Sequence, residues 1–183
     1  MTNRIYDETN APEAARPMLK QAKDNFEFVP NILGVMSGAP ALLKAYMTVS
    51  GIFDETSFSP TERQIIMLSA SHENGCKYCM AAHSAMASMQ NVPDHVIEAL
   101  RNNEPIQDAK LEALRNLTRD MVETRGHPPA DTLKAFKAAG YDDSHVLEVI
   151  LGVGMKTLSN YTNHLAETPL DEAFEGTRWE GAA

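Results

Sequence analysis

The sequence predicts an all-α protein. Apolar residues recur at helical spacing along almost the whole chain, runs of β-branched residues are short, and no stretch shows the period of two that marks a strand. A chain of 183 residues with 43% hydrophobic residues can bury one sizeable core. We therefore expect residues 1–183 to form a single helical domain.

The N-terminal third is expected to contain three helices. The first covers about 12–25, and an extended link follows it because Val29 precedes a proline. Asn31 is predicted to cap a short helix that ends at Gly38, and Pro40 to open the next helix.

The clearest helix start lies further along the chain. Ser59 fits the N-cap, Pro60 the first helical position and Glu62 the third, which together form a capping box. Asn74-Gly75 ends this helix, because glycine tolerates the left-handed conformation found at helix C-termini. The remaining predicted elements are a helix from Cys76 to about Gln90, a helix capped by Asp94, helices over about 106–125, 130–139 and 143–166, and an irregular tail from about 167.

An internal repeat is one further possibility. When the chain is slid along itself until His83 meets His164, two apolar helices align, and each leads into its histidine. The identity is low, so an ancient helical duplication and a chance similarity of amphipathic helices remain equally open.

Composition excludes several classes of protein. The net charge is −9 and no long basic run occurs, which argues against nucleic acid and anionic membranes as partners. The N-terminus is polar and no apolar run approaches a bilayer span, so we expect a soluble, cytoplasmic protein. Two cysteines are too few for a secreted disulfide framework, and their C-x-x-C spacing indicates redox or metal chemistry.

The segment 73–84 carries that chemistry. If Cys76 starts a helix, Cys79 lies three residues further on and His83 four beyond it, so all three share one face. The two sulfurs can then close a small disulfide ring. The free N–H groups at the helix N-terminus also stabilise a thiolate.

Two arguments favour different nucleophiles. The helix dipole favours Cys76, which is nearer the N-terminus. The histidine favours Cys79, because His83 lies one turn away and can accept its proton directly or through one water. We favour Cys79 as the attacking thiol and Cys76 as the thiol that resolves the product and meets the reductant.

Two other interpretations of the motif remain. Both cysteines can be small core residues on an amphipathic helix, since buried cysteines are often inert. Zinc would find three ligands here but needs a fourth, which only His72 or His164 could supply. The sequence favours a redox pair over a zinc site or inert packing.

The motif and its flanks resemble a known superfamily. The stretch SPTERQIIMLSASHENGCKYCMAAHS, with FEFVPNILGVMSGAPALLKAY before it and VLEVILGVGMKTLSNYTNHLAETPLDEAF after it, is similar to the alkylhydroperoxidase D and carboxymuconolactone decarboxylase superfamily, peroxidase-related subgroup. The resemblance covers about residues 10–175. It implies an alkylhydroperoxidase D-like helical bundle, homo-oligomers (often trimers or hexamers), and thiol-based peroxide reduction without metal, haem or flavin. It also implies that Cys79 is peroxidatic, Cys76 resolving and His83 a relay.

One departure from the family concerns the proton relay. The family's relay glutamate corresponds to Gln64, which cannot take a proton, and its second relay histidine corresponds to Tyr78. Glu62 is expected to be occupied by its capping box. Glu73, three residues before Cys76, is the remaining candidate for the relay carboxylate, and the alternative for it is a solvated surface position.

A polar patch is expected near the C-terminus. Asn160 and His164 lie one turn apart on a long apolar helix, with Asn163 beside them. The patch either closes over the thiol pocket or consists of satisfied core or interface groups.

The sequence thus predicts a thiol peroxidase that reduces hydroperoxides through a C-x-x-C dithiol/disulfide cycle, with an external dithiol or disulfide reductant protein as partner. The alternative enzyme is a lyase or isomerase of the carboxymuconolactone decarboxylase type. The alternative without turnover is a redox sensor.

Overall fold

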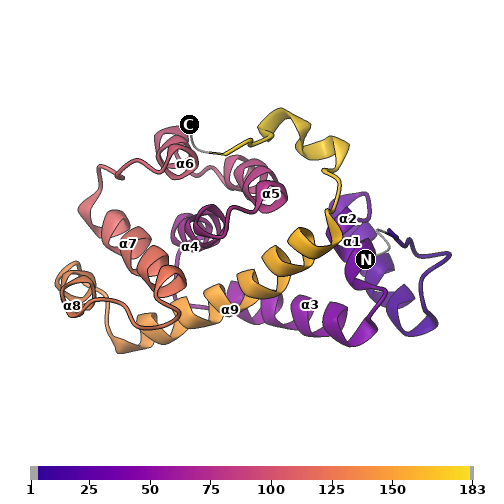
Figure 1. Ribbon diagram of the computed structural model, residues 1–183, viewed down its shortest axis with the longest axis horizontal. Coiled ribbons are helices and arrows are strands. Elements are labelled where there is room, and N and C mark those ends of the chain that lie inside the picture. The colour runs from indigo at the N-terminus through magenta and orange to yellow at the C-terminus, as the bar shows by residue number, and fades with distance from the viewer. Residues whose placement is uncertain (1–3, 182–183) are drawn as a thin grey trace.

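The described part of the chain is built of helices. The computed structural model describes residues 4–181, and no β-strand occurs among them, which confirms the predicted all-α class (Figure 1). None of the helices in this part has the length and apolarity needed to cross a membrane. The elements are, in chain order, η1 (Glu13–Ala15), α1 (Arg16–Phe26), α2 (Asn31–Met36), α3 (Pro40–Asp54), α4 (Pro60–Glu73), α5 (Lys77–Met89), α6 (Asp94–Asn102), α7 (Ala109–Glu123), α8 (Ala130–Ala138), α9 (Asp143–Ala166) and η2 (Glu172–Thr177).

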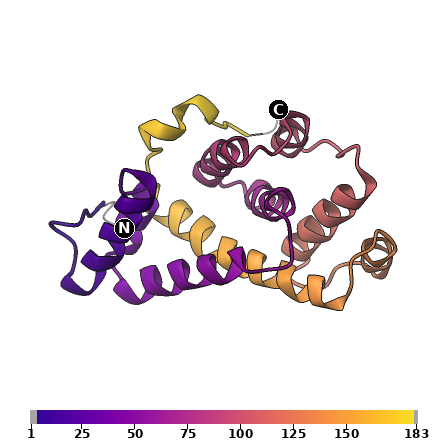
Figure 2. The same ribbon diagram turned by 180° about the vertical axis from the view of Figure 1, so that it is seen from behind.

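Helix α4 occupies the centre of the molecule. It packs against α5, α6, α7 and α9, and Figure 1 shows these helices around it, with α1 to α3 at one end and α8 at the other. The rear view in Figure 2 shows α9 running along one side of the molecule, next to α3. The last long helix therefore joins the N-terminal helices to those that surround α4.

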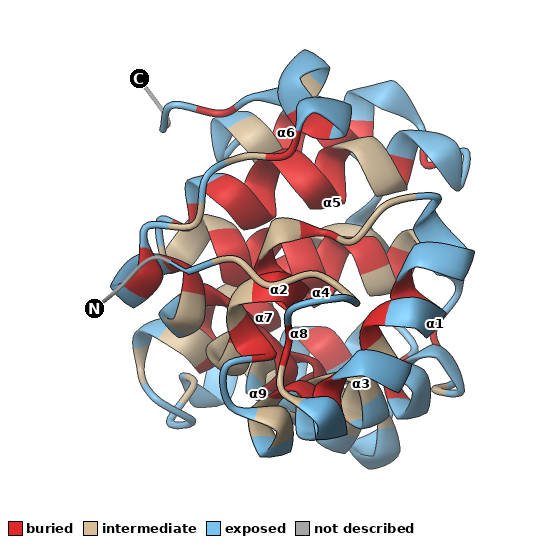
Figure 3. Cartoon of the chain, turned by 90° about the vertical axis from the view of Figure 1, so that its right-hand side faces the viewer, coloured by how far each residue is buried: buried red, intermediate tan, exposed pale blue. Residues whose placement is uncertain are grey.

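Two clusters of buried apolar side chains form the core. The larger cluster surrounds α4 and α7 and includes Ile65 and Leu114. The smaller cluster joins the N-terminal helices to α5, and it contains Leu43 together with Cys76 and Cys79. Figure 3 shows buried residues along both α4 and α5. The redox motif consequently lies inside the core.

Helix α9 approaches α3 and α4 closely at Gly152. A Cβ atom at this position would lie 2.7 Å from Ile66 Cγ2 and 2.8 Å from Phe53 Cε2. These distances are shorter than real carbon contacts, so the crossing requires glycine. The crossing fixes the course of the C-terminal half of α9, which reaches the cysteines.

The predicted boundaries of α4 are confirmed. The Glu62 N–H donates to Ser59 Oγ at 3.3 Å, and the Ser59 N–H donates to the Glu62 carboxylate at 2.8 Å. At the other end, Gly75 has φ +65°, as expected for glycine after a helix. These two signals fix the point at which α5 can begin.

Two predicted caps are wrong by one residue. Asn31 and Asp94 are the first helical residues, and Pro30 and Pro93 occupy the N-cap positions. Proline fits there because its φ is fixed and a helix start needs no N–H from it. The Asn31 N–H instead donates to the carboxylate of Asp171 at 3.0 Å.

Both ends of the described chain also differ from the prediction. The predicted first helix divides into η1 and α1, which begins at Arg16. The predicted irregular tail contains η2 and is fastened to α5 and α6. Thr177 Oγ1 donates to the Ala81 carbonyl at 2.9 Å, and Trp179 Nε1 donates to the Arg101 carbonyl at 2.9 Å.

The internal repeat stays a prediction. The first copy forms two helices, α4 and α5, separated by the turn at Gly75, whereas the second copy falls within the continuous helix α9. His83 is buried and His164 is exposed, so the two aligned histidines have different surroundings.

Candidate redox site

Both cysteines lie at the N-terminus of α5. Cys76 is the N-cap residue, and its N–H donates to the Ser71 carbonyl at 2.9 Å. Cys79 follows in the first turn of the helix. Both thiols are free, and the residues are 1% and 3% exposed. The predicted helix start is confirmed, and the pair lies within the protein interior.

Asn163 brings α9 to the thiols. Its Nδ2 lies 3.3 Å from Cys79 Sγ and 3.8 Å from Cys76 Sγ. A hydrogen bond from an amide N–H is stronger when the acceptor carries a negative charge. The Asn163 side chain therefore bridges the two sulfurs and favours a thiolate at this site.

The two thiols have opposite electrostatic surroundings. Burial disfavours the Cys79 thiolate, but the hydrogen bond from Cys76, the positive charge of Lys156 and the Ser159 hydroxyl outweigh it. Together they hold the pKa of Cys79 well below its ordinary value. The hydrogen bond with Cys79, together with burial, raises the pKa of Cys76. The surroundings thus favour a thiolate at Cys79 and a thiol at Cys76, in the direction expected if Cys79 is the attacking sulfur.

Lys156 is a component of the site that the sequence analysis did not single out. Its side chain is fully buried, and Nζ has no hydrogen-bond partner among the described residues. Lys156, Ser159 and Asn163 follow one another at helical spacing along the buried face of α9. The available signal was a charged residue in an otherwise uncharged stretch, seven residues before Asn163.

His83 is buried one turn along α5 from Cys79. Its Nδ1 lies 3.1 Å from Gln64 Oε1, and Gln64 Nε2 donates to Gln90 Oε1 at 3.1 Å. Because Gln64 presents its oxygen, His83 Nδ1 carries the proton and Nε2 is left as an acceptor. Burial, together with the charge of Lys156, holds the pKa of His83 well below its ordinary value, so the ring is neutral.

Gln64 therefore does not act as a relay carboxylate but orients the imidazole. Within residues 4–181 the ring of His83 makes its hydrogen bond to Gln64 and not to a sulfur. The relay role of His83 stays a prediction, supported by its position on the helix and by its acceptor nitrogen.

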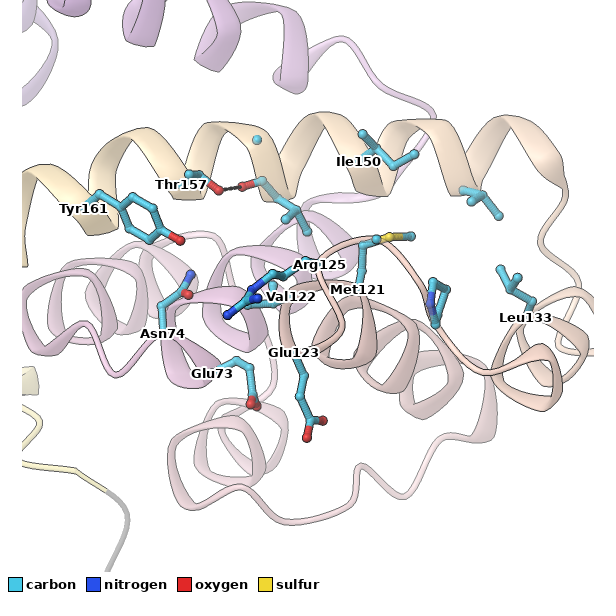
Figure 4. Close-up of a pocket in the computed structure, with 15 residues that line it drawn as sticks. Glu73, Asn74, Met121, Val122, Glu123, Arg125, Leu133, Ile150, Thr157 and Tyr161 are labelled. Atoms are coloured by element: carbon cyan, nitrogen blue, oxygen red, sulfur yellow. Dashed lines mark hydrogen bonds between the residues drawn. The ribbon is translucent and has the colours of Figure 1, made fainter.

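The structure does not bring Glu73 to the thiols. Glu73 and Asn74 line a separate pocket of about 800 Å³ beside α7 and α9, and Figure 4 shows Glu73 beside Glu123 there. Burial and the negative charge of Glu123 raise the pKa of Glu73. Within residues 4–181 Glu73 makes no hydrogen bond to Cys76, Cys79 or His83, so its carboxylate role stays a prediction without a contact to support it.

Tyr78, at the position of the family's second relay histidine, makes an anchoring contact. Its hydroxyl donates to the carboxylate of Asp171, which also accepts the N–H of Asn31. The phenol thereby ties α5 to α2 and to the C-terminal segment. This side chain is occupied outside the thiol pair.

The predicted polar patch on α9 is divided by the structure. Asn163 contacts both thiols, as described above. Asn160 Oδ1 accepts a hydrogen bond from Asn74 Nδ2 at 2.9 Å. His164 is exposed and its ring lies 6.5 Å from that of Tyr161. Only one of the three expected side chains therefore closes over the cysteines.

Neither histidine considered above as a fourth zinc ligand lies with the cysteines. The ring of His72 packs 5.2 Å from that of Trp179, and His164 faces outward. Across residues 4–181, no three His, Cys, Asp or Glu side chains gather as metal ligands would.

Comparisons with known proteins give a partial family match and a similar fold. The profile of the carboxymuconolactone decarboxylase family matches residues 40–120. The fold is similar to that of a peroxidase-related protein with an alkylhydroperoxidase AhpD core from Ralstonia eutropha JMP134, with a TM-score of 0.81 and 18% identity over 93% of this chain and 92% of that one. The fold is also similar to that of a peroxidase-related protein from Silicibacter sp. TM1040, with a TM-score of 0.78 and 18% identity over 92% of this chain and 90% of that one.

A third similar structure is that of the debrominase Bmp8, with a TM-score of 0.80 and 18% identity over 94% of both chains. No protein of curated function matches this chain at a significant level. At such identities the structures establish the fold, and the predicted alkylhydroperoxidase D-like helical bundle is confirmed. The match to the carboxymuconolactone decarboxylase family spans the C-x-x-C-x-x-x-H motif, and it supports the resemblance to the alkylhydroperoxidase D and carboxymuconolactone decarboxylase superfamily.

Proposed function

We propose that this protein is a cytoplasmic thiol peroxidase that reduces hydroperoxides through Cys76 and Cys79. The Cys79 thiolate attacks one peroxide oxygen, the O–O bond breaks, and the product leaves as an alcohol once it has gained a proton. Cys79 is then a sulfenic acid. The Cys76 thiol condenses with it, which forms a disulfide and releases water. An external dithiol reduces this disulfide and is itself oxidised.

The observation that carries this proposal is that two adjacent free thiols have pKa values shifted in opposite directions. Asn163 contacts both sulfurs, the surroundings of Cys79 favour its thiolate, and those of Cys76 favour its thiol. A peroxidatic cysteine must be a thiolate, because the thiolate is the nucleophile. A resolving cysteine can wait as a thiol until a sulfenic acid forms beside it.

His83 is proposed to take the thiol proton when the pair is reset. It is neutral, and the nitrogen not bonded to Gln64 is free to accept. A reduced Cys79 must lose its proton before the next peroxide arrives, and a base one turn away can accept that proton directly or through a water.

A steady-state assay of peroxide consumption with several dithiols tests the activity. We expect turnover in wild type, loss of all reaction in Cys79→Ser, and a single oxidation to a trapped sulfenic acid in Cys76→Ser. Ser144→Ala, at the far end of α9, is a suitable control. Turnover that survives in Cys79→Ser would reject the proposal, and stoichiometric oxidation without turnover under any dithiol would favour the redox sensor.

The pair is also expected to form a reversible disulfide. Mild peroxide should remove both thiols of each chain, and dithiothreitol should restore them, as counted by thiol titration. The physical reason is that Asn163 contacts both sulfurs at once. Stable over-oxidation of one cysteine beside a free partner would contradict the resolving role of Cys76.

Reductive dehalogenation is a second candidate, favoured by the likeness to the debrominase Bmp8, of which an alanine variant is solved with 2,3,4-tribromopyrrole. A thiolate that attacks oxygen can also attack a polarised halogen. Bromide release from brominated pyrroles, measured beside the peroxide assay, distinguishes the two reactions. A lactone-acid lyase or isomerase would instead retain activity when both cysteines are replaced by serine.

A further inference from the structure

The site contains a positive charge that no described acid neutralises. Lys156 has no exposed surface, and its Nζ lacks any hydrogen-bond partner among the described residues. Moving an unpaired ammonium out of water is costly unless an anion accompanies it. Its companions on the buried face of α9 are Ser159 and Asn163, and Asn163 reaches both sulfurs. Because Lys156 also acts on Cys79 electrostatically, the candidate for the missing anion is the sulfur of Cys79.

We propose that Lys156 is the counter-ion of the Cys79 thiolate and the proton donor to the oxygen that leaves when the peroxide bond breaks. The proton-donor role rests on the proposed peroxidase function, whereas the counter-ion role does not. It answers the question raised by Gln64, because an acid at that position is not needed if the ammonium supplies the proton.

The reaction balances in charge and in atoms. The resting pair is Cys79–S⁻ with Lys156–NH₃⁺. Attack on ROOH gives Cys79–SOH and RO⁻, and the ammonium donates one proton to form ROH and a neutral amine. The site thus passes from an ion pair to two neutral groups, and no isolated charge is left buried at any stage.

The reset reverses this proton transfer. The Cys76 thiol condenses with Cys79–SOH to give the disulfide and water. A dithiol then supplies two electrons and two protons. One proton stays on Cys76, and the other returns through Cys79 to the amine of Lys156, which regenerates the ion pair. His83 lies one turn from Cys79 and is placed to pass this second proton.

The other groups around the Cys79 sulfur support Lys156 as its counter-ion. Helix α3 contributes Tyr46, whose pKa is raised by burial and by the charge of Cys79. Helix α5 contributes Cys76, Tyr78 and His83, and α4 contributes the uncharged Gln64 through His83. The positive charge that favours the Cys79 thiolate comes from Lys156 on α9.

The test compares Lys156→Met with wild type. Methionine keeps most of the volume of the lysine stem and removes the charge, and Lys156→Gln is a second neutral variant in case methionine packs badly. Lys134→Met, on an exposed position of α8, removes one positive charge far from the site. Circular dichroism and light scattering check that each variant keeps the fold and assembly of wild type.

The first measurement needs no peroxide. The rate of alkylation of Cys79 is followed against pH by mass spectrometry of its peptide. We expect the pKa of Cys79 to rise in both Lys156 variants toward the ~8.5 of an unperturbed thiol, and to stay unchanged in Lys134→Met. The disulfide should also become harder to reduce in a dithiol redox buffer, because its thiolate product has lost its counter-ion. Superimposable alkylation profiles from folded variants would overturn the counter-ion role.

The second measurement concerns the donor role. If wild type consumes peroxide, its rate at a pH where Cys79 is ionised in every protein should fall by roughly 10²–10⁴ in Lys156→Met, the usual scale for loss of a general acid. An unchanged rate at that pH would overturn the donor role and leave the counter-ion role standing. Absence of peroxide turnover in wild type would instead reject the peroxidase function, and the alkylation profiles would still decide whether Lys156 pairs with Cys79.

Discussion

At the scale of single residues, the site divides its chemistry between two helices. Helix α5 supplies the sulfurs and the imidazole, and the buried face of α9 supplies the amide of Asn163 and the charge of Lys156. Gln64 contributes from α4 by fixing the ring of His83. The sequence motif alone describes only the α5 half of this arrangement.

Restoring a carboxylate at position 64 should make His83 a stronger base. In Gln64→Glu, a negative charge would face Nδ1 where the amide oxygen now lies at 3.1 Å, and an adjacent anion favours the imidazolium. We expect the pKa of His83 to rise from its depressed value. Titration of the ring proton signals by NMR measures the shift. Gln90→Glu is the control, because that side chain contacts Gln64 and is one hydrogen bond further away. An equal shift in both variants would show that general charge, and not this contact, controls the ring.

At the scale of elements, the N-terminus of α4 is held by one carboxylate with several partners. Glu62 closes the capping box with Ser59, accepts the hydroxyl of Tyr141 at 2.8 Å, and pairs with Lys110 at 3.1 Å. Burial raises the pKa of Glu62, but these hydrogen bonds outweigh it and lower the pKa to about 2. The cap thus depends on the ionised form.

The contribution of Glu62 to stability should disappear in acid. Because its folded pKa lies below the unfolded value of 4.5, the ionised group stabilises the fold above about pH 4.5, and this stabilisation is lost as the pH falls toward about 2. Glu62→Gln should therefore melt below wild type at neutral pH, and the gap should close in acid. Thermal melts between pH 2 and 7 measure this, with the exposed Glu104→Gln as control. A gap that is constant with pH would contradict the role of the charge.

Two glycines of α9 should respond in opposite directions to alanine. Gly152→Ala places a Cβ atom against Ile66 and Phe53 and should cost about 1–3 kcal/mol by overpacking. Gly154→Ala meets no atom within 4 Å and should stabilise the helix by about 0.5–1 kcal/mol. Denaturant unfolding measures both. If both variants changed the free energy of unfolding equally, α9 would be able to move at Gly152 without a loss of stability.

The elements differ in how far local sequence could reveal them. Ser59 and Gly75 act through contacts a few residues away, so the boundaries of α4 were predictable. Asn31 and Asp94 were misplaced because a preceding proline competes for the cap. The place of Lys156 beside Cys79 depends on how α9 crosses α4, which is set by the close approach at Gly152 and not by local pattern. The place of Glu73 in a separate pocket was equally hidden, since nearness in sequence to Cys76 does not fix the direction of a side chain.

At the scale of the whole molecule, α9 has a second face that points outward. Large apolar side chains recur along it at helical spacing: Leu147, Ile150, Tyr161 and Leu165 are 66%, 49%, 56% and 69% exposed. Large apolar side chains exposed along one face of a helix often mark a protein interface. Homo-oligomer formation, predicted from the sequence, thus has a specific candidate surface.

We expect light scattering at micromolar concentration to report more than one chain. The double variant Leu147→Glu and Leu165→Glu should lower the mass, because charges would replace apolar side chains in the contact. Met89→Glu, at an exposed site on α5, is the control. A mass of 20.1 kDa for wild type would refute assembly, and an unchanged mass in the double variant would move the interface to another face.

The distance along the chain between Cys79 and Asn163, 84 residues, has a consequence for how the protein is made. During translation the cysteines leave the ribosome long before the amide and the ammonium of α9. Until that helix has been synthesised and has docked, neither sulfur has its stabilising partners, and both remain thiols of low reactivity toward peroxide. Newly made chains should therefore resist oxidant until they are complete, so that reactivity appears only together with the finished fold.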